Sequence, residues 1–197
     1  MIRLPFLRMT AAITAAVTAL LAFPAAAALK PGDTAPLFKA PGYLAGKPIK
    51  FNLAESLRKG PVVVYFFPAA FTQGCNIEAR LFSVAIDDFK KKGVSVIGVT
   101  AGNIDRLAEF SASTEHCSGK FQVVADPGAK IAKQYDATLA LKPGWSNRTS
   151  YVIRQDSRIA FAYSNLDPRE HVRQTLDAVR ALTDKAASVS TKTAAKR

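Results

Sequence analysis

The sequence contains only two cysteines, Cys75 and Cys117, and thiol chemistry is the first activity that its residue types suggest. Cys75 follows an apolar, β-branched run at 61–67 and precedes apolar residues at helical spacing, which predicts that it lies at the start of a helix. The first backbone N–H groups of a helix have no intrahelical partners and carry the positive end of its dipole. They stabilise a thiolate, the nucleophilic form of cysteine, over a thiol. The sequence therefore predicts a reactive thiol at Cys75.

Neither a metal nor a cofactor is expected. Two cysteines cannot supply the four ligands of a structural zinc site, and His116 and His171 lack metal-like spacing. Both histidines have polar neighbours on predicted helices and are expected to be solvated. Glu78 is expected on a helix surface as the partner of an arginine.

The elements that must position Cys75 alternate between strand and helix. Apolar runs predict strands at 61–67, 94–100 and 121–125 and a hairpin of 150–154 with 159–163. Helices are predicted over 75–92, from 103 or 105 to near Cys117, over 127–135 and from 167 onward. Helices that cover a mixed sheet, with a hairpin before the last helix, indicate an α/β protein with a thioredoxin-like fold, a central mixed β-sheet flanked by helices.

The chain is predicted to divide into three segments. Residues 1–28 are typical of a signal peptide, with a basic start, an apolar run at 9–23 and small residues at 24–28 for cleavage. An uncleaved anchor is the alternative, but the apolar run is shorter than the roughly 20 residues that span a membrane. Residues 29–184 are predicted to form one domain. Residues 185–197 are basic and lack an apolar period, and a disordered tail is expected there.

The charge distribution and the predicted signal peptide together limit the classes of partner that the protein is expected to bind. The sequence has 27 basic and 15 acidic residues, a net charge of +12, which is compatible with a polyanion partner. The basic residues are scattered, and no aromatic residues interleave with a basic stripe as single-strand binders require. We therefore expect no nucleic-acid partner. The signal peptide predicts export, to the periplasm or outside the cell, with no stable membrane insertion after cleavage.

The residues around Cys75 carry a resemblance to a known family. Pro68, Thr72 and Cys75 match Pro-x-x-x-Thr-x-x-Cys after a buried strand, and Glu78 stands three residues beyond the cysteine. Arg148 opens a late predicted strand. With the lead-in at 32–38, these motifs occur in the order found in the peroxiredoxin family, of the alkyl hydroperoxide reductase and thiol-specific antioxidant type. Over about 31–182 the chain resembles this family, and its bacterioferritin-comigratory or Q-type branch above all.

The resemblance implies a thiol-dependent peroxidase. Cys75 would attack a hydroperoxide and become a sulfenic acid, which a thioredoxin-like protein or a small thiol would recycle. Donors at Thr72, Arg148 and the backbone N–H groups near Cys75 would stabilise the moving charge. Pro68 would shield the sulfur from water. For Thr72, simple capping of the helix is an open alternative.

Two positions depart from the family pattern and leave the role of Cys117 open. Gln73 replaces a frequent proline, and Arg80 stands where many Q-type members carry a second cysteine. The resemblance then suggests Cys117 as the resolving cysteine, with the two sulfurs apart in the reduced fold; an idle thiol is the alternative. A thioredoxin-like oxidoreductase would need a cysteine where Glu78 stands.

The alternative from another class is a non-catalytic exported module of thioredoxin-like fold. In that case a structural disulfide between Cys75 and Cys117 would stabilise the fold by about 4 kcal/mol. This interpretation leaves Pro68, Thr72 and Arg148 without a role.

Overall fold

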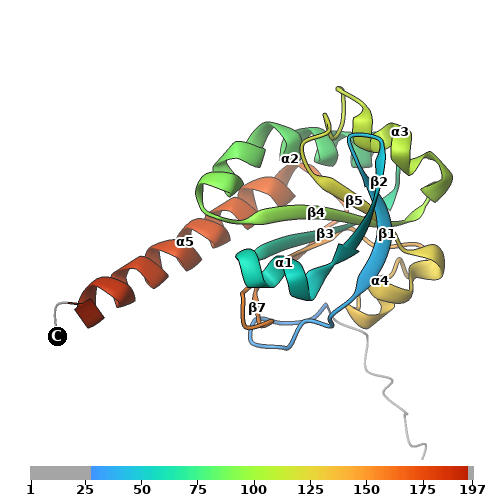
Figure 1. The fold of residues 1–197 in the computed structure, drawn as a ribbon. Coiled ribbons are helices and arrows are strands. Elements are labelled where there is room, and N and C mark those ends of the chain that lie inside the picture. Colours follow the sequence, from blue (N-terminus) through green and yellow to red (C-terminus); the bar gives the residue numbers. More distant parts are fainter. Residues whose placement is uncertain (1–27, 195–197) are drawn as a thin grey trace, which may run out of the picture.

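A mixed β-sheet of seven strands forms the centre of the protein in this computed structural model, which describes residues 28–194 (Figure 1). The strand order is β2-β1-β5-β4-β3-β6-β7; β3, β4 and β5 are parallel, and the other neighbours are antiparallel. The strands are β1 (Lys39–Leu44), β2 (Lys47–Asn52), β3 (Val62–Ala69), β4 (Ser95–Gly102), β5 (Gln122–Ala125), β6 (Thr149–Ile153) and β7 (Ile159–Ser164). The expected thioredoxin-like α/β fold is confirmed.

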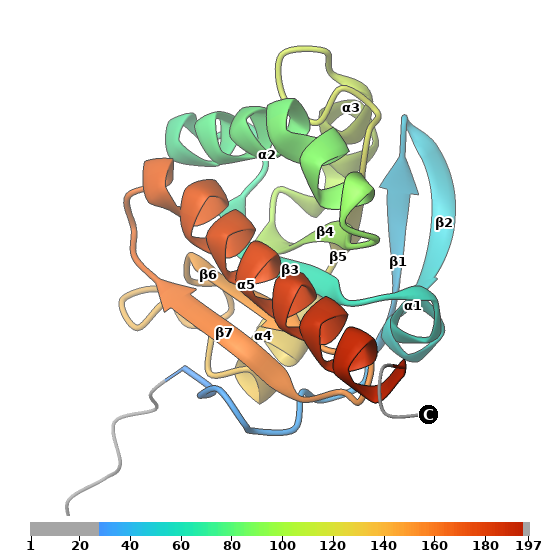
Figure 2. The ribbon, with the colours of Figure 1, turned by 90° about the vertical axis from the view of Figure 1, so that its left-hand side faces the viewer.

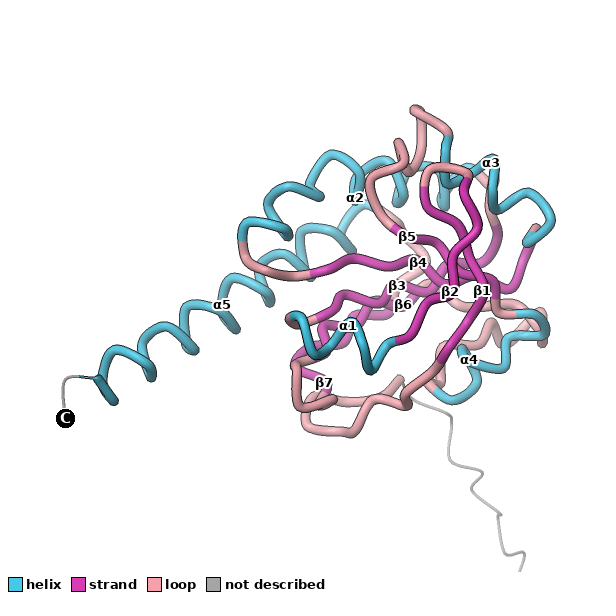
Figure 3. The backbone as a smooth tube through the Cα atoms, in the orientation of Figure 1, coloured by secondary structure: helices cyan, strands magenta, loops and turns pink. Residues whose placement is uncertain are grey.

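Helices cover both faces of this sheet (Figures 2 and 3). The helices are α1 (Leu53–Lys59), α2 (Gln73–Lys91), α3 (Leu107–Ala112), α4 (Lys130–Gln134) and α5 (Arg169–Ala194), with short 3-10 turns at Ile104–Arg106 and Pro127–Ala129. α2, α3 and α5 pack on one face, and α1 and α4 pack on the other. Figure 2 shows α2 and α5 side by side over the first face.

The alternation of side chains along β3 explains why the sheet is buried on both sides. Successive strand residues point to opposite faces. Val63, Tyr65 and Phe67 therefore join the core beneath α2 and α5, while the residues between them join the core beneath α1 and α4. Every residue from 62 to 67 is at most 1% exposed. This rigid central strand fixes the start of the segment that carries Cys75.

The N-terminal part of the domain contains more regular structure than the sequence predicts. The lead-in at 29–57 forms the hairpin of β1 and β2 followed by α1. β1 carries Pro41 and Gly42 in its middle and has no apolar run, so it gives no strand pattern; pairing with β2 and β5 makes it a strand. The hairpin turns through Ala45 and Gly46, both with positive φ.

The two ends of the chain compare differently with the predictions. The predicted signal peptide lies outside the described residues, apart from Ala28. The expected disordered tail from 185 is wrong as far as Ala194, because α5 continues to that residue. This segment has no Gly or Pro to end a helix, and its alanines favour helix. Within the described chain, no helix combines the length and apolar character needed to cross a membrane.

Candidate active site

Cys75 lies where β3 gives way to α2. The strand ends at Ala69, and α2 begins at Gln73, so the cysteine occupies the first turn of the helix. Between them Phe71 takes a positive φ of 61°, an uncommon conformation for a bulky residue that turns the chain sharply. Asn103 supports this turn by donating from Nδ2 to the Ala70 carbonyl at 2.8 Å. The Cys75 side chain is buried, in a residue that is 1% exposed.

Pro68 and Thr72 flank this turn at the predicted positions. Both are half-buried, and the Pro68 carbonyl accepts from Thr100 Oγ1 at 3.1 Å. Thr72 occupies the N-cap position, but its side chain makes no capping hydrogen bond. Its hydroxyl donates instead to the Ala69 carbonyl at 3.0 Å. Thr72 therefore begins the helix through its backbone, because its carbonyl accepts from the Asn76 N–H at 2.9 Å, and its hydroxyl oxygen can still accept a hydrogen bond.

Arg148 joins the cysteine to a buried carboxylate. It immediately precedes β6 and is 4% exposed. Its guanidinium donates from Nη2 to Cys75 Sγ at 3.5 Å, from Nη1 to Glu78 Oε2 and from Nε to the Leu166 carbonyl at 2.9 Å. A planar fork with separate donors suits three acceptors in fixed directions. Glu78 pairs with an arginine as expected, but inside the protein, because it is 0% exposed.

Glycine at position 74 leaves room for this contact. A Cβ atom built on Gly74 would lie 2.9 Å from Arg148 Nη2, closer than real Cβ contacts allow. A side chain there would displace the guanidinium or the first turn of α2. The glycine thus permits the close approach of Arg148 to the cysteine.

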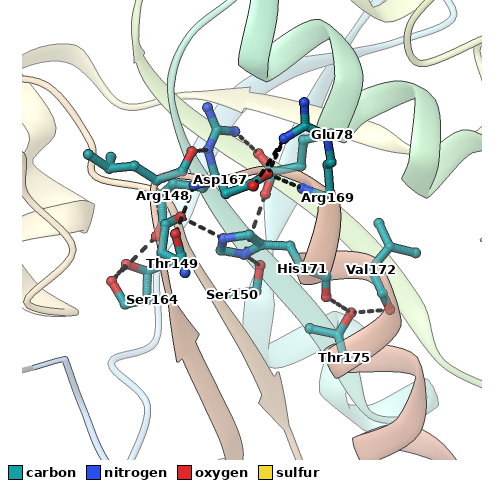
Figure 4. Close-up of polar contacts among 12 residues, drawn as sticks. Glu78, Arg148, Thr149, Ser150, Ser164, Asp167, Arg169, His171, Val172 and Thr175 are labelled. Carbon is teal, nitrogen blue, oxygen red and sulfur yellow. Dashed lines mark hydrogen bonds and ion pairs between the residues drawn. The ribbon is translucent and has the colours of Figure 1, made fainter.

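His171 lies against Glu78 on the inner side of the site. The expectation that it is solvated is wrong. It lies in the first turn of α5 and is 0% exposed. Figure 4 shows its ring between Ser150 and the Glu78 and Arg148 pair. Nε2 donates to the Asn165 carbonyl at 2.8 Å, and Nδ1 accepts from Ser150 Oγ at 2.8 Å. The sequence did contain a signal, because His171 shares a helix face with Val179, eight residues on.

Burial dominates the protonation of this cluster. It lowers the pKa of His171 to about 4, so the ring is neutral near pH 7. Burial also raises the pKa of Glu78 to about 8, although Arg148 opposes the shift. Glu78 Oε1 lies 3.6 Å from His171 Nδ1 and makes no hydrogen bond with any described group. Around Arg148, burial works against the charge, but Glu78 and Cys75 together raise the pKa of the guanidinium.

Cys117 shares the buried core with Cys75 but takes no part in the polar contacts that join Arg148, Glu78 and His171. It is not at the end of a helix as predicted, because α3 ends at Ala112 and Cys117 falls in the turns that follow. Ser113 leaves the helical conformation, with φ −57° and ψ 123°. Cys117 is 0% exposed, and burial raises the pKa of its thiol well above the usual range. Both cysteines are free thiols, which does not favour the structural-disulfide alternative.

The neighbour of Cys117 connects its turn to the loop before Cys75. His116 is 8% exposed, and thus not solvated as expected. Its ring stacks on Phe110 at 5.1 Å and meets the edge of Phe71 at 5.4 Å between ring centroids. Arg80 of α2 also reaches this segment, because it donates to the Thr114 carbonyl at 3.1 Å. The two cysteine-bearing segments therefore share a packed boundary.

The described residues contain no group of three His, Cys, Asp or Glu side chains that could hold a metal ion. The chemistry that the arrangement offers is that of a sulfur at a helix N-terminus with a cation beside it.

Comparison with known proteins identifies a family for the chain. Residues 31–162 match the AhpC/TSA family. Chloroplastic peroxiredoxin Q of Oryza sativa subsp. japonica is 31% identical over 123 residues, which cover 62% of this chain and 55% of the rice protein. The same-named protein of Sedum lineare is 28% identical over 138 residues, covering 70% of this chain and 71% of its own length. The chain thus spans little more than half of the rice relative.

Solved structures give the same result. The crystal structure of the peroxidoxin BcpB from Mycobacterium tuberculosis is 28% identical with a TM-score of 0.67, covering 78% of this chain and 97% of that one. Reduced 2-Cys peroxiredoxin from Plasmodium vivax, at 20% identity and a TM-score of 0.72, covers 81% of this chain and 99% of its own, and it supports the fold alone. With the family match across most of the described residues, these likenesses show that the chain belongs to the AhpC/TSA family.

Proposed function

We propose that this protein is an exported thiol-dependent peroxidase that reduces hydrogen peroxide or organic hydroperoxides through Cys75. The observation that carries the proposal is the contact of Arg148 Nη2 with Cys75 Sγ at 3.5 Å, in the first turn of α2. A guanidinium lies at a sulfur in the first turn of a helix, an arrangement typical of cysteine nucleophiles.

The reaction that this site supports is a nucleophilic displacement on oxygen. The Cys75 thiolate attacks the peroxide oxygen that carries hydrogen, and the O–O bond breaks. The other oxygen leaves as hydroxide or alkoxide and takes up the proton that the Cys75 thiol released, which gives water or an alcohol. The sulfur gains an oxygen and becomes a sulfenic acid. Negative charge moves from sulfur toward the departing oxygen, and Arg148 offers a donor to both positions.

The neighbouring residues have complementary roles in this proposal. Thr72 presents its hydroxyl beside the sulfur and orients the peroxide, while Pro68 closes the end of β3 and limits the access of water. Glu78 and the Leu166 carbonyl accept the other guanidinium donors and so hold Arg148 in place. Positioning of this kind lowers the barrier because the donors need no reorganisation during the reaction.

For recycling, we infer that Cys117 is the resolving cysteine. The Cys117 thiol condenses with the Cys75 sulfenic acid to give a disulfide and water, and a thioredoxin-like protein or a small thiol reduces the disulfide. A disulfide needs Cα atoms within about 7 Å, and we infer that the first turn of α2 opens locally to bring the two buried, free thiols together. The strained turn at Phe71, packed against His116, lies where this opening must begin.

Export rests on the residues before the domain. The basic, apolar and small-residue order at 1–28 favours removal by a signal peptidase and a periplasmic or secreted location. Mass spectrometry of the protein from its host should find a chain that begins near Ala28 or Leu29. Intact Met1 in the soluble cytoplasmic fraction would contradict export without affecting the chemistry.

The peroxidase proposal is tested by peroxide consumption with excess dithiol. Wild-type protein should turn over hydrogen peroxide, and Cys75→Ser should not, although it should unfold at the same temperature. Cys117→Ser should react with one equivalent of peroxide at the wild-type rate. Full turnover by Cys75→Ser would overturn the proposal.

Peptide mapping after one equivalent of peroxide separates the two recycling routes. A linked peptide that contains Cys75 and Cys117 supports resolution by Cys117. A stable sulfenic acid on Cys75, with Cys117 still open to alkylation after unfolding, would show a one-cysteine mechanism.

A further inference from the structure

Tyr65 carries a buried hydroxyl that forms no hydrogen bond with any described residue in the reduced fold. It lies in the middle of β3 and is 0% exposed, in the core beneath α2. Its ring stacks on Phe82 of α2 at 4.4 Å between centroids. Its hydroxyl oxygen has no hydrogen-bond partner among residues 28–194. The other two tyrosines of the deep core are different, because Tyr135 donates to the Pro36 carbonyl and Tyr151 to the Tyr135 carbonyl.

An unpaired buried hydroxyl lowers the stability of a fold, because it loses its hydrogen bonds to water and gains none. Phenylalanine would fill the same space without this cost, as it does at the flanking position 67. The fold also keeps room for the hydroxyl: a Cβ on Gly98 of β4 would lie 2.8 Å from the Tyr65 oxygen. The hydroxyl is thus accommodated without serving the stability of the reduced state.

Tyr65 shares its core with both cysteines, and its ring meets the edge of Phe121, four residues after Cys117, at 6.0 Å between centroids. Burial, followed by the negative forms of Cys117, Glu78 and Cys75, raises the pKa of Tyr65 well above its usual range. Tyr65 therefore keeps its proton and is a neutral donor within the core that holds both cysteines. Arg148 already donates to the Cys75 sulfur, whereas no described side chain donates to the sulfur of Cys117.

We propose that the Tyr65 hydroxyl donates a hydrogen bond to the Cys117 sulfur during disulfide formation, as a further catalytic residue of the resolving step. This inference rests on the proposed role of Cys117. As the turn around Phe71 opens, Cys117 gives up its proton and its thiolate attacks the sulfur of the Cys75 sulfenic acid. The S–O bond breaks, and the leaving hydroxide takes up that proton as water. Tyr65 keeps its own proton and stabilises the thiolate, which its apolar surroundings otherwise disfavour.

The test compares Tyr65→Phe with Tyr151→Phe as a matched control. Each removes one buried hydroxyl, but the Tyr151 hydroxyl is hydrogen-bonded at 2.6 Å on the opposite face of the sheet. Stopped-flow peroxide reduction gives the rate at Cys75, and acid quench with alkylation and peptide mapping gives the rate of disulfide formation. Thermal unfolding reports stability, and both rates are measured from pH 6 to 9.

Tyr65→Phe should form the disulfide about tenfold or more slowly, the worth of a hydrogen bond to a charged partner. The pH at which the rate of disulfide formation rises should be higher in Tyr65→Phe than in the wild type. The rate of the peroxide step and the unfolding temperature should not fall. Tyr151→Phe should show the reverse, with a lower unfolding temperature and an unchanged rate of disulfide formation.

Equal rates of disulfide formation in wild type and Tyr65→Phe would overturn this inference alone. So would a slower peroxide step with normal disulfide formation, because it would assign the hydroxyl to Cys75. A wild-type protein that forms no disulfide between Cys75 and Cys117 would overturn both this inference and the resolving role of Cys117, and would leave the peroxidase proposal standing.

Discussion

Arg148→Ala removes the one side chain that joins the sulfur, the buried carboxylate and the loop before α5. The magnitude follows from the 3.5 Å contact between Nη2 and Cys75 Sγ. Among the described residues, Arg148 is the only side chain that donates to this sulfur, so the substitution removes that donor altogether. The backbone N–H groups of α2 remain and offset part of this loss. Loss of a single oxyanion donor typically costs about 100- to 1000-fold in rate. We therefore expect the second-order rate constant with hydrogen peroxide to fall by about 100-fold or more.

The same substitution disturbs stability, and the experiment must separate the two effects. Breaking a buried ion pair costs about 3 to 5 kcal/mol when the remaining charge stays unpaired. Because burial raises the pKa of Glu78 to about 8, its carboxyl can take up a proton near neutral pH, and the loss should lie at the lower end. Arg148→Ala combined with Glu78→Gln removes the unpaired acid, so it should regain stability without regaining rate.

The assay is stopped-flow peroxide reduction at pH 7, with thermal unfolding of each variant alongside. Arg148→Lys provides a matched control, because it keeps the positive charge but cannot reach three acceptors at once. Its rate should fall between those of wild type and Arg148→Ala. An unchanged rate constant in folded Arg148→Ala protein would refute the role assigned to the guanidinium.

Three further substitutions test the site and the fold that carries it. Gly74→Ala places a Cβ 2.9 Å from Arg148 Nη2, so the peroxide rate should drop by roughly tenfold or more with little change in unfolding temperature. Asp126→Ala removes the carboxylate that accepts from two backbone N–H groups at the start of α4, and chemical denaturation should show a loss of about 1 to 2 kcal/mol. The pKa of His171 is lowered to about 4, so its stabilising contribution should be complete above pH 6.5 and fall as the pH drops toward 4, by up to about 3 kcal/mol. Denaturation from pH 4 to 7 should show the stability advantage of wild type over His171→Gln shrinking toward acid, and a constant difference would contradict the buried neutral ring.

The sequence predicted those elements whose burial leaves a clear pattern. β3 and β4 are apolar on both faces, and α2 carries apolar residues at helical spacing, so each was found within a few residues. The hairpin of β1 and β2 was missed because it lies at the sheet edge and is half-exposed, so pairing with a neighbour rather than composition makes it a strand.

The site was predictable from its motifs but not from periodicity. Cys75 and Arg148 are 73 residues apart, and no local pattern brings them together; only the family resemblance linked them. The burial of Glu78 and His171 was missed because charged and polar residues are expected at the surface unless a partner is known. Likewise, strand alternation places Tyr65 in the core but says nothing about whether its hydroxyl finds an acceptor.

The central claim is that Cys75 is the nucleophile that takes oxygen from a peroxide. The most direct measurement is mass spectrometry of the Cys117→Ser protein, mixed with one equivalent of hydrogen peroxide and then with dimedone, which traps sulfenic acids. We predict one dimedone adduct per chain, on the peptide that carries Cys75, with its yield following the peroxide consumed. Peroxide consumption without an adduct or any other oxidation at Cys75 would contradict the account.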